Sequence, residues 1–509
     1  MFSTVFIHSV VLLNAFTLRF VCAQLPLPYP PYIPPNLADG ALRTSGRPNP
    51  QWSNLLGNLL YFYEAQRSGE LPSTNRVPWR NSSTLNDGKD VDLDLTGGYF
   101  DAGDYIKATF PLTAVLQSIC WGAADFGEGY DATNQTVYLD DMLRWGLDWL
   151  MKAHPSPNTL YVLVGNTDVD DAYWGGDLNI PSFRPSYQIN DTNPGTDAAA
   201  GASAAFSACA SLYSNRSFGG PYSLPASLQN SSYAEKLLTH AQQLYTFAVN
   251  ATGGQKNYQT SVPEIATSYG SSSYTDELTL AALLLSWATN STSLYQQAED
   301  YYNMFKLSGQ NGVFNWDSKI PGLAVLFAQI SQSDSSIGGN FSVWRDEAER
   351  YFDRIVNKQG PGYLTRDGLL YYDGDSDDAS LNPALNAAML LTRYAQIAST
   401  AAKKASYLAF ARLTFFVALD YNAPLLTLAA MHVVNDTTDP FFTSLEIGAY
   451  GKVQPKGQPC DSAFPRACAG PQLSRGGKIA MAMMITIVGL FISSLLAWYL
   501  YELNATKVA

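Results

Sequence analysis

The sequence is poor in the residues that mark zinc sites and nucleic-acid binding. Only 5 Cys and 4 His occur among 509 residues, and they show no zinc-ligand spacing. Lys and Arg number 31 against 44 Asp and Glu, so the net charge is -13 and no basic patch is available to neutralise phosphates. These shortages exclude a zinc-binding framework and argue against a nucleic-acid partner.

Alternating strand patterns are scarce, and no repeat of constant period is present. Hydrophobic residues instead recur at helical spacing from residue 52 onward, between loops rich in Gly, Asp, Ser and aromatic residues. Helices are predicted over 52–66, 111–121, 136–154, 197–213, 233–249, 276–289, 293–307, 322–330, 343–356 and 382–398, followed by one long apolar stretch over 406–434. About a dozen helices with long loops and no fixed period indicate an all-α enzyme domain rather than a repeat array.

The two ends of the chain predict a secretory route and a membrane anchor. Residues 1–23 resemble a signal peptide, and the Pro-rich residues 24–49 read as an extended spacer. A stalk at 435–478 precedes 479–501, an uncharged apolar run long enough to span a bilayer. The polar tail 502–509 favours a true span over a lipid anchor signal. We therefore expect a single-pass protein of the cell membrane, with residues 24–478 extracellular or lumenal and a short cytoplasmic tail.

Glycosylation sites and cysteines agree with this route. Asn-X-Ser/Thr sites occur at Asn81, Asn134, Asn190, Asn215, Asn230, Asn250, Asn290, Asn340, Asn435 and Asn504. Removal of the signal peptide leaves an even number of cysteines. Cys460 and Cys468 are close enough to bridge in the stalk, whereas Cys120 and Cys209 could either pair or remain two buried thiols.

The segment from Thr96 to Lys107 is the strongest candidate for chemistry. Asp101 and Asp104 are separated by only Ala and Gly, and a glycine pair precedes them, so the backbone can turn tightly and approach a ligand. Asp also favours turns and helix caps for local hydrogen bonding, so the pair alone could be an acidic turn. The surrounding motifs decide between these readings.

Several of these motifs resemble one enzyme family. They are 61–69 (YFYEAQRSG), 75–80 (NRVPWR), 94–107, 152–155 (KAHP), 184–187 (RPSY), 194–197 (PGTD), 276–278 (DEL), 314–317 (FNWD), 386–388 (NAA) and 417–423 (VALDYNA). Together they resemble glycoside hydrolase family 9, the inverting endo-β-1,4-glucanases, over residues 50–434. The resemblance implies an (α/α)6 barrel that hydrolyses β-1,4-glucan such as cellulose, without a cofactor.

The resemblance also implies roles for individual residues. Asp104 is expected to be the general base and Asp101 the partner that orients the water, facing an acid about 6.5 to 9.5 Å away. Apart from the resemblance, Trp174, Trp316 and Tyr372 lie in loop-like segments among polar residues, where they could stack on glucose rings, although aromatic residues equally pack barrels. His154 could bond a substrate hydroxyl or simply favour a helix end.

Two acidic loops raise the question of calcium. The first contains Asp168, Asp170 and Asp171, and the second, over 373–378, has carboxylates at alternate positions. The second loop lacks the downstream Gly and Glu of an EF-hand, so both are read as solvated loops and no metal site is predicted.

The sequence departs from the family pattern at the proton donor. Phe416 occupies the place of the family's Glu, and the loop that should precede it is missing, since Arg412 runs almost directly into the last helix. Asp420, about one helical turn away, is a poor substitute. We therefore expect a barrel that is incomplete at its penultimate helix and an impaired enzyme. The alternatives are a non-catalytic glucan-binding membrane protein and a non-productive splice form.

Overall fold

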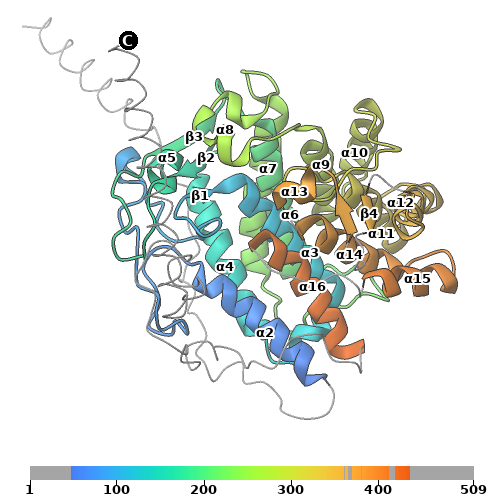
Figure 1. Ribbon diagram of the computed structural model, residues 1–509. Coiled ribbons are helices and arrows are strands. Elements are labelled where there is room, and N and C mark those ends of the chain that lie inside the picture. The colour runs from blue at the N-terminus through green and yellow to red at the C-terminus, as the bar shows by residue number, and fades with distance from the viewer. Residues whose placement is uncertain (1–47, 360–361, 365–369, 380, 412–418, 436–509) are drawn as a thin grey trace, which may run out of the picture. The chain divides into compact units, whose positions relative to one another are not determined.

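The computed structural model describes residues 48–359, 362–364, 370–379, 381–411 and 419–435 (Figure 1). The predicted signal peptide, the spacer up to residue 47, the stalk after residue 435, the span at 479–501 and the tail lie outside these residues. No helix within the described ranges is long and apolar enough to cross a bilayer.

Two concentric sets of helices make up the described part of the chain. The inner helices are α3 (Thr109–Ala132), α6 (Thr196–Tyr213), α9 (Thr275–Thr289), α11 (Ile320–Ser333), α14 (Asn382–Ala395) and α16 (Leu419–Asn435). The outer helices are α2 (Pro50–Ala65), α4 (Thr136–Ala153), α7 (Ser231–Asn250), α10 (Thr292–Met304), α12 (Phe341–Val356) and α15 (Ala401–Ala411).

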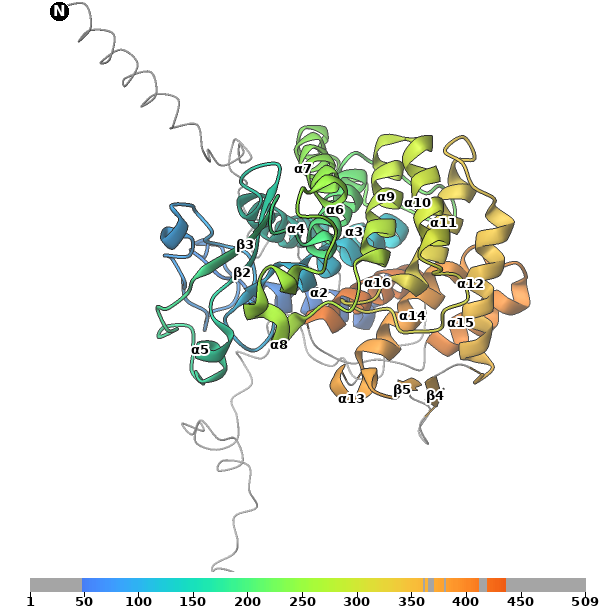
Figure 2. The ribbon, with the colours of Figure 1, turned by 90° about the horizontal axis from the view of Figure 1, so that it is seen from above.

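The inner helices form a closed ring. Each of them contacts the next in chain order, and α16 returns to contact α3. Five outer helices pack on an inner helix that is their neighbour in the chain: α4 on α3, α7 on α6, α10 on α9, α12 on α11 and α15 on α14. The remaining outer helix, α2, packs on α16. Figure 2 shows α7, α10 and α12 at the periphery. Such a closed ring is the expected (α/α)6 barrel.

Side-chain composition separates the two sets of helices. Every residue of α6 is buried, and the helix is made largely of Ala, Gly and Ser, which allow neighbouring backbones to approach. By contrast, α12 buries a single stripe that includes Trp344, Tyr351 and Phe352. The backbones of α3 and α16 approach closely, since a Cβ at Gly129 would lie 2.1 Å from the carbonyl oxygen of Ala430.

A disulfide joins two inner helices. Cys120 of α3 and Cys209 of α6 are bonded, with their Cα atoms 5.1 Å apart. This bond decides between the two alternatives that the sequence left open for these cysteines.

The described residues of the apolar stretch at 406–434 belong to two helices, α15 up to Ala411 and α16 from Leu419. The penultimate helix, α15, has 11 residues and is the shortest of the outer helices described. Residues 412–418, where the deletion was inferred, lie outside the described part of the chain.

Small β elements at one end of the barrel were not predicted. Strands β1 (Lys107–Ala108), β2 (Thr159–Val164) and β3 (Ser186–Asn190) form an antiparallel sheet, and β4 (Gly362–Leu364) pairs with β5 (Leu370–Tyr372). Nearly all of β2 is buried, so its sequence TLYVLV shows no alternation. Short helical turns fill the loops: η1 (Lys89–Val91), α5 (Thr167–Asp171), η2 (Tyr258–Thr260), η3 (Pro263–Ile265), α8 (Ala266–Tyr269) and α13 (Asp375–Ala379).

Candidate active site

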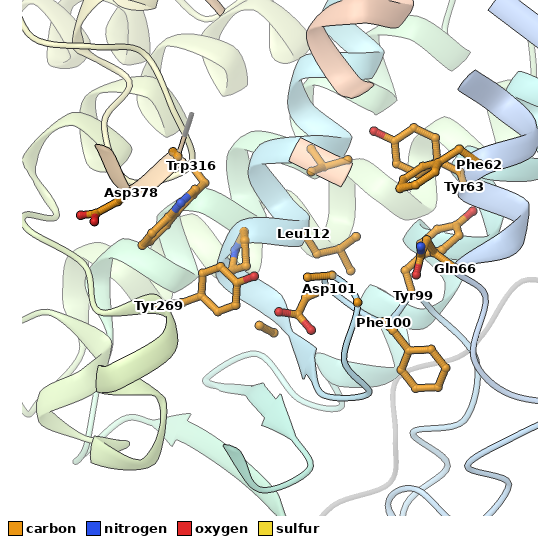
Figure 3. A pocket seen from close by; sticks show the side chains of 16 residues that line it. Phe62, Tyr63, Gln66, Tyr99, Phe100, Asp101, Leu112, Tyr269, Trp316 and Asp378 are labelled. Atoms are coloured by element: carbon orange, nitrogen blue, oxygen red, sulfur yellow. The ribbon is translucent and has the colours of Figure 1, made fainter. Parts of the chain in front are cut away.

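A cavity of about 500 Å³ opens at the end of the barrel where the inner helices begin (Figure 3). Its walls come from the end of α2 and from the segments that lead into α3, α9, α11 and α14. The lining residues are Phe62, Tyr63, Gln66, Tyr99, Phe100, Asp101, Ala102, Gly103, Ala108, Pro111, Leu112, Val115, Tyr269, Trp316, Asp378 and Ala379. Aromatic rings and one aspartate loop therefore dominate the wall.

The aspartate loop is fixed at both ends. Gly98 has a φ of +73°, and a Cβ there would lie 2.5 Å from the ring of Trp149, so only glycine fits without displacement. After the loop, the fully buried Lys107 donates from Nζ to the carbonyl oxygens of Leu95 (2.6 Å) and Gly97 (3.1 Å). The same ammonium pairs with Asp87 at 2.7 Å. The loop geometry is thus set by a buried cation.

Asp101 and Asp104 form a close carboxyl pair beside the cavity. Both oxygens of Asp101 and Oδ1 of Asp104 are shielded from solvent without a hydrogen bond of ordinary geometry. Burial, and next the Asp104 carboxylate, raise the pKa of Asp101 well above its usual range, although the Tyr269 hydroxyl favours its ionised form. Unsatisfied polar atoms at a cavity wall indicate a site that receives water or a polar ligand. The pair can carry one proton and one negative charge.

Trp316 is the predicted aromatic residue that reaches the cavity. Its ring meets Tyr269 edge-on at 5.2 Å, and both side chains line the wall. Lys319 holds the backbone there, because its Nζ donates to the carbonyl oxygen of Trp316 (2.6 Å) and to Glu277 (3.0 Å). A rigid apolar ring on the wall is suited to stacking on a sugar.

Trp174 is not brought to this cavity. Its side chain is 73% exposed in the loop after α5, and it is absent from the cavity wall. The loop is still tied to the aspartate segment, since the Tyr105 hydroxyl donates to the carbonyl oxygen of Gly175 at 2.7 Å. Trp174 therefore lies on the surface, in a loop that is hydrogen-bonded to the aspartate segment.

Tyr372 and His154 are also absent from the cavity wall. Tyr372 is 3% exposed within β5, with its hydroxyl 3.4 Å from that of Tyr351. His154 is completely buried, and its Nδ1 lies 2.7 Å from Nδ1 of His240. Packing and internal hydrogen bonds engage both side chains in the described structure.

Two acidic residues that the sequence grouped into loops come close to the site. Asp378 lines the cavity beside Trp316, but its carboxylate points away from Asp101 in Figure 3. Asp170 belongs to the family-like motif at 164–174 and was interpreted as a solvated loop acid, yet it is 6% exposed and lies beside Asp104. In the described ranges, no group of three His, Cys, Asp or Glu side chains is arranged to hold a metal ion.

The buried histidine pair predicts acid-sensitive stability. Burial, and then the charge of His240, lower the pKa of His154 to about 3, and burial lowers that of His240 to about 4. Unfolded histidine titrates near 6.5, so below that pH the unfolded chain binds protons that the folded chain does not. Each histidine then costs about 1.4 kcal/mol of stability per pH unit as the pH falls toward 4.

The variant His240→Asn tests this coupling. Its amide can still bond His154 but does not titrate, so the drop in melting temperature from pH 6.5 to pH 4.5 should be about half the wild-type drop. Equal drops in both proteins would mean that the pair does not govern the acid response.

Comparison with known proteins places this geometry in context. The family model described as Glycosyl hydrolase family 9 matches residues 52–427. Endoglucanase 24 of Oryza sativa subsp. japonica is 32% identical over 378 residues, which cover 73% of this chain and 65% of that protein. Endoglucanase 15 of Arabidopsis thaliana is 37% identical over 329 residues, covering 64% and 62%. The chain thus spans somewhat less than two thirds of the length of these relatives.

Solved structures share the fold. An endoglucanase from the termite Nasutitermes takasagoensis has a TM-score of 0.65 and 30% identity, covering 75% of this chain and 98% of the termite chain. The cellulase Cel9M of C. cellulolyticum, solved in complex with cellobiose, has a TM-score of 0.63 at 22% identity, with coverage of 75% and 98%. The second likeness concerns the fold alone.

Proposed function

Because the chain belongs to glycosyl hydrolase family 9, we propose that it hydrolyses internal β-1,4-glucosidic bonds of a glucan such as cellulose, with inversion. The observation that carries this proposal is the carboxyl pair Asp101 and Asp104 beside an aromatic cavity. The endoglucanase relatives and the termite endoglucanase structure support the substrate class.

The pair supplies the water-activating half of an inverting mechanism. Asp104, as the ionised partner, accepts a proton from water while that water attacks the anomeric carbon. Asp101 carries the other proton, because burial and the neighbouring charge favour its neutral form, and it can orient the same water. Trp316 offers a face on which a glucose ring can lie during the attack.

We further propose that the proton-donating half is missing. Phe416 stands where the family has its acidic residue, and the side chain of Asp378 points away from Asp101 in Figure 3. Loss of a general acid costs about 10²- to 10⁴-fold in rate, so hydrolysis of an unactivated glucan should be slow. Residue 416 lies outside the described part of the chain, so this proposal depends on the sequence.

A second candidate function is glucan binding without hydrolysis, which Phe416 favours. Carboxymethylcellulose separates the two candidates. Slow release of reducing ends with an early fall in viscosity would support an endo-acting enzyme. Binding to soluble glucan with no reducing ends, even after prolonged incubation, would overturn the enzymatic proposal. Sequencing the transcript across codons 405–425 tests the third possibility, a non-productive splice form.

We also propose a secretory location at the cell membrane. The disulfide between Cys120 and Cys209 supports an oxidising compartment. The sequon asparagines within the described residues are all exposed or partly exposed. The membrane span itself rests on the apolar sequence 479–501. Digestion of the full-length protein with an N-glycosidase, followed by alkaline carbonate extraction of membranes, tests the two parts separately.

A further inference from the structure

Asp170 lies in the short helix α5, directly after the loop that follows β2. The side chain of Asn166 caps this helix by accepting a hydrogen bond from the backbone N–H of Val169 at 3.0 Å. Asp170 then faces the aspartate loop, and its two oxygens lie 3.1 and 3.0 Å from the backbone nitrogen of Tyr105, which donates to them. The Asp170 carboxyl group therefore fixes the backbone of Tyr105, the residue that follows Asp104.

The same carboxyl group also interacts with Asp104. Asp104 favours the protonated form of Asp170 through its charge and through a side-chain hydrogen bond. It acts in the same two ways on Asp101. Two carboxylates can share a hydrogen bond only when one of them carries a proton. When protonated, the Asp170 carboxyl group can therefore donate to Asp104.

Other groups around Asp170 set its charge. Burial raises the pKa of Asp170 to about 6, while the Tyr105 N–H and the Arg184 guanidinium favour its ionised form. Arg184 is itself engaged, because it pairs with Asp87 at 2.7 Å and donates to the carbonyl oxygen of Tyr105 at 2.6 Å. The neighbours of Asp170 on α5, Asp168 and Asp171, are exposed.

We propose that Asp170 is a positioning residue of the water-activating site: its protonated carboxyl donates to Asp104 and its acceptor oxygen holds Tyr105. Negative charge then resides on Asp104, the group that takes the proton from water. Ionisation of Asp170 would remove the donor and place a like charge beside the base. This inference rests on the proposed function, because it assigns Asp170 to the same reaction.

The test uses 2,4-dinitrophenyl β-cellobioside, whose leaving group needs no proton, so the missing acid does not limit the rate. In Asp170→Ala, kcat should fall by about 10- to 100-fold, with KM changing less than threefold. In Asp170→Asn, kcat should stay within about threefold of wild type, because an amide accepts from Tyr105 and donates to Asp104. The exposed Asp171→Asn is the matched control and should leave both constants unchanged.

The pH profile separates positioning from a merely structural role. Wild-type kcat should decline above pH 6 as Asp170 loses its proton, whereas the Asp170→Asn profile should stay level there, since an amide does not titrate. An identical decline in both proteins, or full activity in Asp170→Ala, would overturn the inference.

An infrared readout keeps the inference testable without turnover. At pH 5 the protonated-carboxyl band of the wild type should lose the contribution of one carboxyl group in Asp170→Asn and keep its full intensity in Asp171→Asn. If the cellobioside is not cleaved at all, the proposed function fails, and this band still decides the state of Asp170. If wild type cleaves it and the band is unchanged in Asp170→Asn, only the present inference fails.

Discussion

Replacement of Asp104 by Asn should lower the hydrolysis of 2,4-dinitrophenyl β-cellobioside by about 10²- to 10⁴-fold. An amide cannot accept the proton of the attacking water, and the activated leaving group makes water attack the limiting step. KM should change little, because the aromatic wall of the cavity, which includes Trp316, is untouched.

Asp101→Asn is the matched control for this loss. Asp101 favours its neutral form, so an amide at this position preserves a hydrogen-bond donor toward Asp104. We expect a reduction of less than about tenfold, which is below the range for loss of a general base. If Asp101→Asn lost more activity than Asp104→Asn, the roles of the two residues would have to be exchanged. Activity of Asp104→Asn equal to wild type would rule out Asp104 as the base.

Restoring the missing acid should have an effect of similar size in the opposite direction. Insertion of the family's segment between residues 412 and 416, ending in Glu at the place of Phe416, should raise hydrolysis of β-1,4-glucan by about 10²- to 10⁴-fold. The activated cellobioside should gain less than threefold, because its leaving group departs without a proton. Adding Asp104→Asn to the restored chain should abolish the gain.

The same insertion ending in Gln is the control for repair of the fold alone. It rebuilds the loop but supplies no proton. A glucan rate that rises equally with Glu and Gln would show that the deletion impairs folding or binding rather than proton donation. A high glucan rate in the unmodified chain would show that another residue already supplies the proton.

The sequence predicted those parts of the molecule that local patterns determine. Helical periodicity gave most helices of the barrel, with boundary errors such as an end at residue 121 for α3, which continues to Ala132. Asp101 and Asp104 after a glycine pair predicted a tight turn that can approach a ligand, and the structure brings that turn to the cavity. The family resemblance predicted the barrel, and the loop-like surroundings of Trp316 suggested a ring that could stack on a sugar; the structure places that ring on the cavity wall.

The remaining site features depend on contacts distant in sequence. Asp170 faces Asp104 because β2 pairs with β1 and so carries α5 back to the aspartate loop. The short sequence of α5 has no periodicity from which the position of Asp170 could be predicted. His154 precedes a proline at a helix end, which suggested a bond to substrate or a favourable partner for that helix end, yet its ring lies against His240 on α7. Tyr372 lies among acidic loop residues, but strand pairing in β5 turns its side chain into the core.

In the proposed reaction, a water molecule activated by Asp104 attacks the face of the sugar opposite the leaving group. Proton NMR of the first product released from 2,4-dinitrophenyl β-cellobioside reads this stereochemistry before mutarotation. We predict that α-cellobiose appears first and then equilibrates. Initial formation of β-cellobiose would contradict the account, because it would require a covalent intermediate on a carboxylate rather than direct attack by water.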